Sequence, residues 1–368
     1  MALVDADAHV VENEHTFDFL DPADRGYRPV LFDIHQTRRA HDGFRKAWFI
    51  DGKLRTPFTQ PEITEEELVE VGEKTGRPLN VPLAARRLEN IPVRLAHMDA
   101  LKIDIQILYP TLFIGQITDK PALEVGLCRS YHRWMDEVWQ QGGGRLRWVA
   151  PMPMLSMEDT LAMLPWVKEH GAAAINMRCI EGHRLLHDPY FYPLYAAASD
   201  LDLPIAIHIS NGNLEFFHQV RSRITWGAGY WSTAVPTVGS AHSFLEAGIP
   251  QRFPKLRVGL VEAAAQWIPW VTKDLHFRTG GRLPAKGLFE QSNMYVSCYS
   301  STDDIEYIAE YSGEGCLMTG TDYGHTDMSA ETDALQRLAD SGTVRPGLVK
   351  KILEDNPMKF YALQDLKR

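Results

Sequence analysis

The stretch Leu3-Val4-Asp5-Ala6-Asp7-Ala8-His9 places ionisable residues at every second position after an apolar pair. A period of two is the period of a β-strand, so Asp5, Asp7 and His9 are predicted to project from one face and the alanines from the other. Ionisable groups on one face of a short apolar strand are costly to bury unless their charge is compensated. A divalent cation would compensate it, because carboxylate oxygen and imidazole nitrogen are good metal ligands. The alternative is a polar edge strand that faces water.

Later apolar segments repeat the strand pattern and alternate with segments of helical periodicity. Further strands are expected at residues 104–110, 147–152, 173–178, 203–208, 256–262, 293–298 and 316–322. Eight such strands separated by helices predict a parallel sheet closed into a (β/α)8 TIM barrel. A doubly wound open sheet is the alternative, but no glycine-rich phosphate-binding turn follows the first strand.

The composition limits the classes of function. The chain has 368 residues, of which 45% are hydrophobic, and we expect one barrel domain over residues 1–368 because α/β barrels commonly reach this size. The formal charge of −10 and the lack of a basic stripe argue against a nucleic-acid partner. Four widely spaced cysteines, no signal-like segment and no apolar run of about 20 residues predict a cytoplasmic protein without a membrane partner.

A long polar stretch, about 13–90, separates the first strand from the regular part of the chain. It is too long for a simple loop, so we expect it to carry structure of its own. Thr64 followed by Glu67 is typical of a capping box at a helix start. We interpret the stretch as an insertion that covers the site or makes a subunit contact, and we expect a homodimer or a higher homo-oligomer.

Candidate metal ligands stand where the predicted strands end. Catalytic groups of such barrels lie at the C-terminal ends of the strands, which form one mouth. Each residue alone has a simpler explanation, since His208 could be a core histidine, Glu262 could pair with Arg178, and Asp322 could cap the next segment. Their convergence favours a metal site. The residues at these ends are Asp7, His9, Arg178, His208, Glu262 and Asp322.

Seven segments, in order and with matching spacing, carry a family resemblance that covers nearly the whole chain. They are Val-Asp-Ala-Asp-Ala-His-Val-Val-Glu (4–12), 98–111, 187–195, Leu-Pro-Ile-Ala-Ile-His (203–208), 252–258, Gly-Thr-Asp-Tyr-Gly-His (320–325) and Asn356-Pro357. The chain resembles the amidohydrolase superfamily, in particular the amidohydrolase-2 branch, which contains aminocarboxymuconate-semialdehyde and resorcylate-type decarboxylases and many less defined hydrolases. The resemblance implies metal ligands at Asp7, His9, His208 and Asp322.

The chain departs from the family pattern in three places. Asp7-x-His9 replaces the more usual His-x-His or Glu-x-His. The sixth strand ends in Glu262, where the decarboxylases usually have a histidine that is thought to transfer a proton. This weakens a decarboxylase assignment and offers another carboxylate ligand. The fourth strand has no lysine to bridge two metals. The site is therefore expected to bind either one or two divalent ions, and the ion can be Zn, Fe or Mn.

The expected function is metal-dependent hydrolysis of a small-molecule ester, thioester, amide or lactone by metal-activated water. Asp322 is predicted to carry the proton, Arg178 to bind a substrate carboxylate or oxyanion, and His325 to orient substrate or donate a proton. The first alternative is non-oxidative decarboxylation of an aromatic or unsaturated acid. The second is a barrel whose metal serves binding or structure only.

The remaining site predictions concern residues around these groups. Glu12 is expected to hold His9 in one tautomer. Asn176, on the fourth strand, is a predicted substrate-binding residue. Trp226, Tyr230 and Trp231 lie between the fifth and sixth strands and are predicted to form an apolar wall over the mouth, with ordinary loop packing as the alternative.

Overall fold

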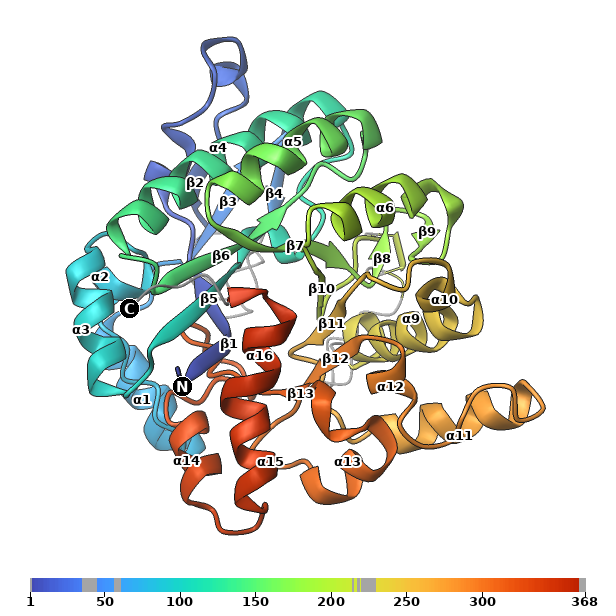
Figure 1. Ribbon diagram of the computed structural model, residues 1–368. Helices are drawn as coiled ribbons and strands as arrows, with labels where there is room; N and C mark the ends of the chain where they lie inside the picture. The colour runs from blue at the N-terminus through green and yellow to red at the C-terminus, as the bar shows by residue number, and fades with distance from the viewer. Residues whose placement is uncertain are drawn as a thin grey trace.

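Eight parallel strands form one sheet in the computed structural model, which describes residues 2–34, 45–55, 61–213, 215–216, 219 and 230–363 (Figure 1). The sheet order follows the chain, which is the order of a barrel. Seven of the strands overlap the ranges predicted above for the later strands, and the first includes residues 4–9 of the opening stretch. The strands are β1 (Val4–Val10), β5 (Ile105–Pro110), β6 (Leu146–Pro151), β7 (Ala172–Arg178), β10 (Ile205–His208), β11 (Val258–Val261), β12 (Met294–Ser297) and β13 (Leu317–Met318).

The chain segment after β13 closes the barrel against β1. The backbone N–H of Ala6 donates to Thr319 O at 3.2 Å, and that of Asp322 donates to Asp7 O at 2.8 Å. Gly320 permits this approach, because a Cβ there would lie 2.4 Å from the Cβ of Asp7. The predicted (β/α)8 barrel is therefore confirmed.

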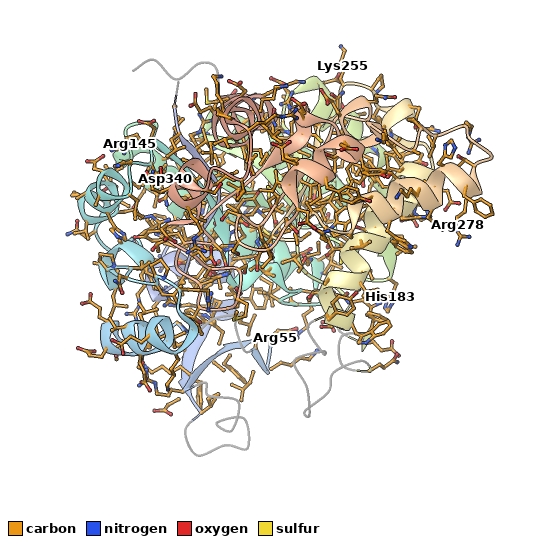
Figure 2. The ribbon with its side chains drawn as sticks, turned by 90° about the horizontal axis from the view of Figure 1, so that it is seen from below. Arg55, Arg145, His183, Lys255, Arg278 and Asp340 are labelled. Carbon is orange, nitrogen blue, oxygen red and sulfur yellow. The ribbon has the colours of Figure 1, made fainter. Side chains whose placement is uncertain are left out.

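Helices surround the ring of strands on its outer side (Figure 1). Three of them are α3 (Ile91–Ala100), α4 (Pro121–Gln141) and α5 (Met157–Glu169). The other longer helices are α6 (Tyr192–Asp200), α9 (Val235–Glu246), α11 (Ile268–Arg278), α13 (Ile305–Ser312), α14 (Ala334–Asp340) and α15 (Pro346–Lys350). Charged side chains such as Lys255 and Arg278 point outward from this layer (Figure 2). No helix among the described residues has the length and apolarity to cross a membrane.

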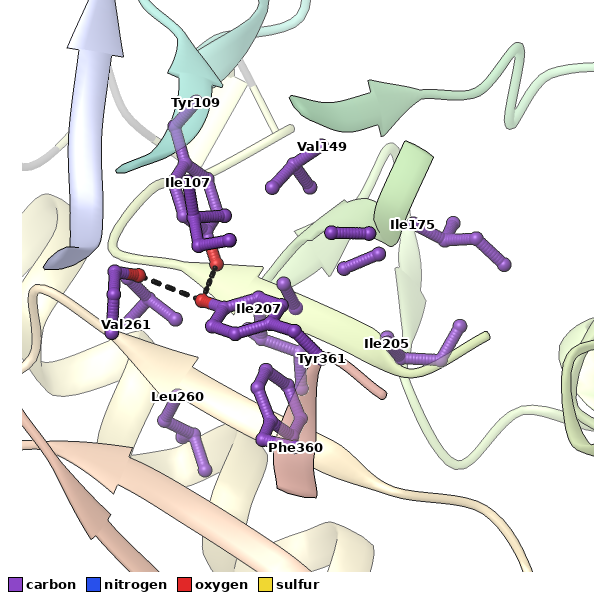
Figure 3. Close-up of a cluster of buried hydrophobic side chains, with 14 of the residues drawn as sticks. Ile107, Tyr109, Val149, Ile175, Ile205, Ile207, Leu260, Val261, Phe360 and Tyr361 are labelled. Atoms are coloured by element: carbon purple, nitrogen blue, oxygen red, sulfur yellow. Dashed lines mark hydrogen bonds between the residues drawn. The ribbon is translucent and has the colours of Figure 1, made fainter. Parts of the chain in front are cut away.

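Helix α16 (Asn356–Phe360) fills the end of the barrel where the strands begin (Figure 3). The hydroxyl of Tyr361 donates to Ala6 O at 2.7 Å and lies 2.7 Å from the hydroxyl of Tyr109. Phe360 packs beside Gly259, where a Cβ would come 2.5 Å from its ring. Aromatic side chains thus pack the interior at the end where the strands begin, and catalytic groups of such barrels lie at the opposite end.

The stretch between β1 and α3 has structure of its own, as expected. It contains α1 (Glu65–Thr75), α2 (Leu83–Arg86) and an antiparallel sheet of β2 (Val30–Asp33), β3 (Lys46–Ile50) and β4 (Lys53–Arg55). The predicted capping box is present, since Glu67 N donates to Thr64 Oγ1 at 3.2 Å and Thr64 N donates to Glu67 Oε2 at 2.8 Å.

Candidate metal centre

A β-bulge in β1 divides the acidic residues of the first strand. Asp5 pairs with Gln106 and Ala8 with Leu108 on β5, so three steps on β1 match two on its neighbour. The prediction that Asp5, Asp7 and His9 share one face is therefore wrong. Asp5 faces the helix layer, where its carboxylate accepts hydrogen bonds from Gln106 Nε2 at 2.9 Å and from the backbone and hydroxyl of Thr321 at 2.9 and 2.6 Å.

Asp7, His9 and His208 gather inside the barrel at the ends of β1 and β10. The Nε2 atoms of His9 and His208 lie 3.1 Å apart, and Asp7 Oδ1 lies 3.6 and 3.8 Å from them. All three side chains are buried. Asp7 Oδ1 makes no hydrogen bond with any described residue. Buried polar atoms are rarely left without a partner, so this oxygen points to a group that the protein chain does not supply.

Asp322, Glu262 and His325 complete the cluster from the ends of β13 and β11. Asp322 Oδ1 lies 3.4 Å from His9 Nε2 and 2.8 Å from His325 Nδ1, yet it forms no hydrogen bond among the described residues. Glu262 Oε2 lies 3.0 Å from His208 Nε2. The predicted ligand residues are thus brought together.

The donor atoms are close enough to share a cation. Within each of two groups, one ligand atom per residue lies within 4.8 Å of all the others. Mixed carboxylate oxygens and imidazole nitrogens suit Zn, Fe or Mn, and the unpartnered oxygens of Asp7 and Asp322 face the imidazoles. The residues therefore fit a divalent ion. The groups are His9, Glu262, Asp322 and His325, and Asp7, His9 and His208.

The backbone is strained at two of these residues. Glu262 has φ of 57° and Asp322 has φ of 49°, in the left-handed region that non-glycine residues seldom adopt. Such conformations cost on the order of 1–3 kcal/mol and cluster at functional sites. Here they turn two carboxylates into the mouth directly after β11 and β13.

Electrostatics inside the cluster disfavour full ionisation of the acids. Burial, followed by the negative charges of Glu262, Asp327 and Asp7, raises the pKa of Asp322 well above its usual value. Burial and Asp327 raise the pKa of Glu262 to about 7, although His208 opposes the shift. Crowded carboxylates of this kind become easier to ionise once a cation is bound between them.

Thr111 sets the tautomer of His325. Its hydroxyl donates to Val10 O at 2.7 Å and lies 2.9 Å from His325 Nε2, so the hydroxyl oxygen accepts and Nε2 carries the hydrogen. Burial, followed by nearby His9, lowers the pKa of His325 well below its usual value, which keeps the ring neutral. The lone pair of Nδ1 then faces Asp322, which makes His325 a further candidate ligand in addition to its predicted catalytic role.

Ser329 is a site residue that the sequence analysis missed. Its hydroxyl lies 2.9 Å from both Glu262 Oε1 and Asp322 Oδ2 and also contacts the carboxylate of Asp327. Ser329 lies in an irregular loop and belongs to no motif. Only its position in the segment that follows Asp322 and His325 could have indicated a role in the site.

The predicted substrate contact of Arg178 is wrong, and so is the alternative that it pairs with Glu262. Its guanidinium lies 2.8 Å from Glu181 Oε2 and 3.5 Å from Glu124 Oε1, and it donates to the carbonyls of Phe113 and Gly115. A buried arginine held by two carboxylates has no free donors for a substrate, and it ties the loops after β5 and β7 together.

Glu12 also differs from its predicted role. Its two carboxylate oxygens accept hydrogen bonds from the backbone N–H groups of Thr111 and Leu112, at 3.1 and 2.8 Å. His9 Nδ1, which Glu12 was expected to hold, has no hydrogen-bond partner in the described part of the chain. The physical reason is that the orphan N–H groups after β5 are the nearer donors, so Glu12 fixes the loop that carries Thr111.

The predicted substrate-binding residues are not gathered into one described pocket. Asn176 is buried in the barrel beside Ala206 and Pro151, and its Oδ1 has no partner among the described residues. Tyr230 and Trp231 are 63% and 58% exposed. Trp226 lies outside the described residues, so the apolar wall stays a prediction.

Comparison with protein families identifies the family of this chain. The family described as Amidohydrolase matches residues 80–363, and the chain belongs to this amidohydrolase family. The resemblance read from the sequence is therefore confirmed. A comparison with curated proteins finds no match.

Solved structures share the fold at low sequence identity. An amidohydrolase from Mycobacterium avium subsp. paratuberculosis is 19% identical with a TM-score of 0.75, covering 98% of this chain and 99% of its own. A 5-carboxyvanillate decarboxylase from Sphingomonas paucimobilis is 18% identical with a TM-score of 0.66, covering 98% and 99%. A dihydroxybenzoic acid decarboxylase from Polaromonas, with bound manganese and the inhibitor 2-nitroresorcinol, is 15% identical with a TM-score of 0.66, covering 99% and 98%.

Proposed function

We propose that the protein is a metal-dependent enzyme whose site binds one divalent ion, Mn, Zn or Fe, between β1, β10 and β13. The observation that carries the proposal is the pair of buried, unpartnered oxygens of Asp7 and Asp322 that face imidazole nitrogens. His9 and His208 supply those nitrogens, and Glu262 and His325 are further ligand candidates.

The preferred reaction is non-oxidative decarboxylation of a small aromatic or unsaturated carboxylic acid. In support, two of the three solved structures described above bear the names of decarboxylases. The carbon–carboxylate bond breaks, CO₂ leaves, and the electron pair that stays on carbon takes a proton. When bound, the cation supplies positive charge that holds the substrate carboxylate and a neighbouring oxygen.

The chain's own residues would hold and move that proton. Glu262 stands at the end of β11, where the resemblance places the proton-transfer histidine of the decarboxylases. Its Oε2 lies 3.0 Å from His208 and its Oε1 accepts from Ser329. A carboxyl group fixed at both oxygens in this way can deliver a proton to one defined point in the mouth. The missing histidine therefore does not exclude decarboxylation.

Metal-assisted hydrolysis, the activity expected from the sequence, is the second candidate. The observation that favours it is the number of carboxylates at the mouth, since Asp322, Glu262 and Asp327 all contact Ser329. Such a set can accept a proton from water and return it to a leaving group, with Asp322 as the carrier.

A paired assay separates these candidates. CO₂ release from 2-hydroxybenzoates is measured alongside hydrolysis of ester, thioester, amide and lactone panels, using protein whose metal content is known from elemental analysis. We expect decarboxylation that a chelator abolishes and Mn²⁺ restores. Hydrolysis without CO₂ release would replace the first candidate by the second, and turnover by protein shown to be metal-free would refute both.

A further inference from the structure

The loop after the eighth strand, residues 324–332, is held in place by the insertion. Arg77 follows α1, and its Nη1 donates to Ala330 O at 2.7 Å and also to Asp327 O. Its Nη2 donates to Thr326 O at 3.5 Å. Arg77 is only 7% exposed. One guanidinium thus fixes three carbonyls within five consecutive loop residues.

Two further contacts join the same parts of the chain. Thr332 N donates to Pro78 O at 3.1 Å, and Arg86 Nε donates to Gly324 O at 2.6 Å. Arg86 and Thr332 bracket the loop, whereas Arg77 holds its middle. The loop has no helix or strand of its own. Contacts from the insertion therefore help to fix its conformation, together with the hydrogen bond from Glu331 N to Thr321 O at 2.9 Å.

Ser329 lies in the middle of the loop, and the contacts of its hydroxyl with three carboxylates require an accurately fixed position. A hydroxyl has one hydrogen, yet three carboxylate oxygens surround that of Ser329, from Glu262, Asp322 and Asp327. A small displacement of the hydroxyl would remove the polar group that lies between two crowded carboxylates. Such outer partners of metal ligands typically change metal affinity or activity by 10–100-fold when removed.

We propose that Arg77 is a positioning residue for the metal centre, which acts through the backbone of residues 326–330 and the hydroxyl of Ser329 on Glu262 and Asp322. The inference rests on the proposed metal function. It gives the insertion a part in building the site, because Arg77 lies outside the barrel strands and its guanidinium donates to carbonyls of this loop.

The test is a double-mutant cycle read by Mn²⁺ binding, with Arg77→Ala, Ser329→Ala and the double variant compared with the wild type by calorimetry. We expect each single change to weaken Mn²⁺ binding about tenfold. Because both act through one hydroxyl, the double variant should bind within about twofold of Ser329→Ala. Arg77→Lys keeps a charged donor and should fall between wild type and Arg77→Ala.

Arg28→Ala is the matched control. Arg28 also belongs to the insertion and also donates to two backbone carbonyls, those of Phe17 and Glu14, each at 2.9 Å. Its loss should leave Mn²⁺ affinity within twofold of wild type. Wild-type affinity in Arg77→Ala, or independent effects that multiply in the double variant, would overturn the inference.

Hydrogen exchange keeps this inference distinguishable from the proposed function. If the wild type binds no Mn²⁺, the metal function fails, and the cycle is read from amide exchange of residues 324–332. We then expect faster exchange in Arg77→Ala than in Arg28→Ala. Unchanged exchange would show that Arg77 does not hold the loop.

Discussion

Asp5 and Asp7 stand two residues apart on one strand, and both are buried, but their surroundings are opposite. The carboxylate of Asp5 is enclosed by Gln106 and Thr321, with hydrogen bonds to both oxygens. Asp7 faces the imidazoles of His9 and His208 with an oxygen that has no partner in the described chain. The bulge in β1 causes this division.

Under the proposed function, the difference is that between an acid that stabilises the fold and an acid that binds metal. A buried carboxylate that is fully hydrogen-bonded stabilises one conformation, and Asp5 does so by joining β1 to β5 and to the segment after β13. A buried carboxylate oxygen without a hydrogen-bond partner in the protein destabilises the folded chain, and binding of a cation to that oxygen would offset the cost. We therefore expect changes at Asp5 to alter stability and changes at Asp7 to alter metal binding.

The largest expected effect is that of Asp7→Asn on turnover and metal content. Replacing a charged ligand at the cluster should reduce both, and turnover should fall at least about 1,000-fold, equivalent to roughly 4 kcal/mol. Metal content is measured by elemental analysis after dialysis. The metal-free variant should unfold at a denaturant concentration close to that of the metal-free wild type. Normal metal content would remove the contrast between the two aspartates.

Asp5→Ala should have the next largest effect, on stability. It removes the acceptor for Gln106 Nε2 and for Thr321, and each buried donor left without a partner costs about 1–3 kcal/mol. We expect a loss of about 3 kcal/mol in the free energy of unfolding, measured with urea on metal-free protein. Loss of Mn²⁺ affinity in folded Asp5→Ala protein, with unchanged unfolding, would reverse the assignment.

The pH dependence of unfolding sharpens the comparison further. Burial raises the pKa of Asp5 to about 6, although Thr321 and Gln106 oppose the shift. The folded state therefore binds this proton more tightly than the unfolded state does. The protonated carboxyl of Asp5 therefore stabilises the folded state fully below about pH 4, and this stabilisation is lost as the pH rises through about 6. The stability difference between wild type and Asp5→Asn should change by about 2 kcal/mol over this range. Parallel unfolding profiles would contradict it.

Tyr361→Phe should give the smallest effect. It removes the hydrogen bond to Ala6 O and the contact with the hydroxyl of Tyr109 below the site. We expect a loss of about 1 kcal/mol in the free energy of unfolding and Mn²⁺ affinity within twofold of wild type. A larger change in affinity than in stability would mean that the barrel interior below the site shapes the metal centre.

The barrel and the gathering of the candidate ligand residues could be predicted because they depend on repeated local patterns. Apolar runs ended by His208, Glu262 and Asp322 identified strand ends, and parallel strands in a barrel place such ends at one mouth. The helix start at Thr64 followed from a cap whose two partners are three residues apart.

What could not be predicted depends on contacts between distant segments. The bulge after Asp5 is fixed by Gln106 and Thr321, about 100 and 316 positions away in the chain. Arg178 was placed at the right strand end, but no sequence pattern pointed to Glu124, in the first turn of α4, as its partner. Ser329 lies in a loop without periodicity, so only the folded arrangement shows its contacts with Glu262 and Asp322.

The closure of β1 against the segment after β13 determines the order in which parts of the barrel can form during translation. The carboxylate of Asp5 is joined to Thr321 across 316 positions of sequence, and Asp7 meets Asp322 at the same seam. During translation β1 cannot make these contacts until β13 has left the ribosome, so Asp5 and Asp7 are exposed to solvent until then. Contacts of such long range slow folding, so we expect closure of the barrel between its first and last strands to be a late step.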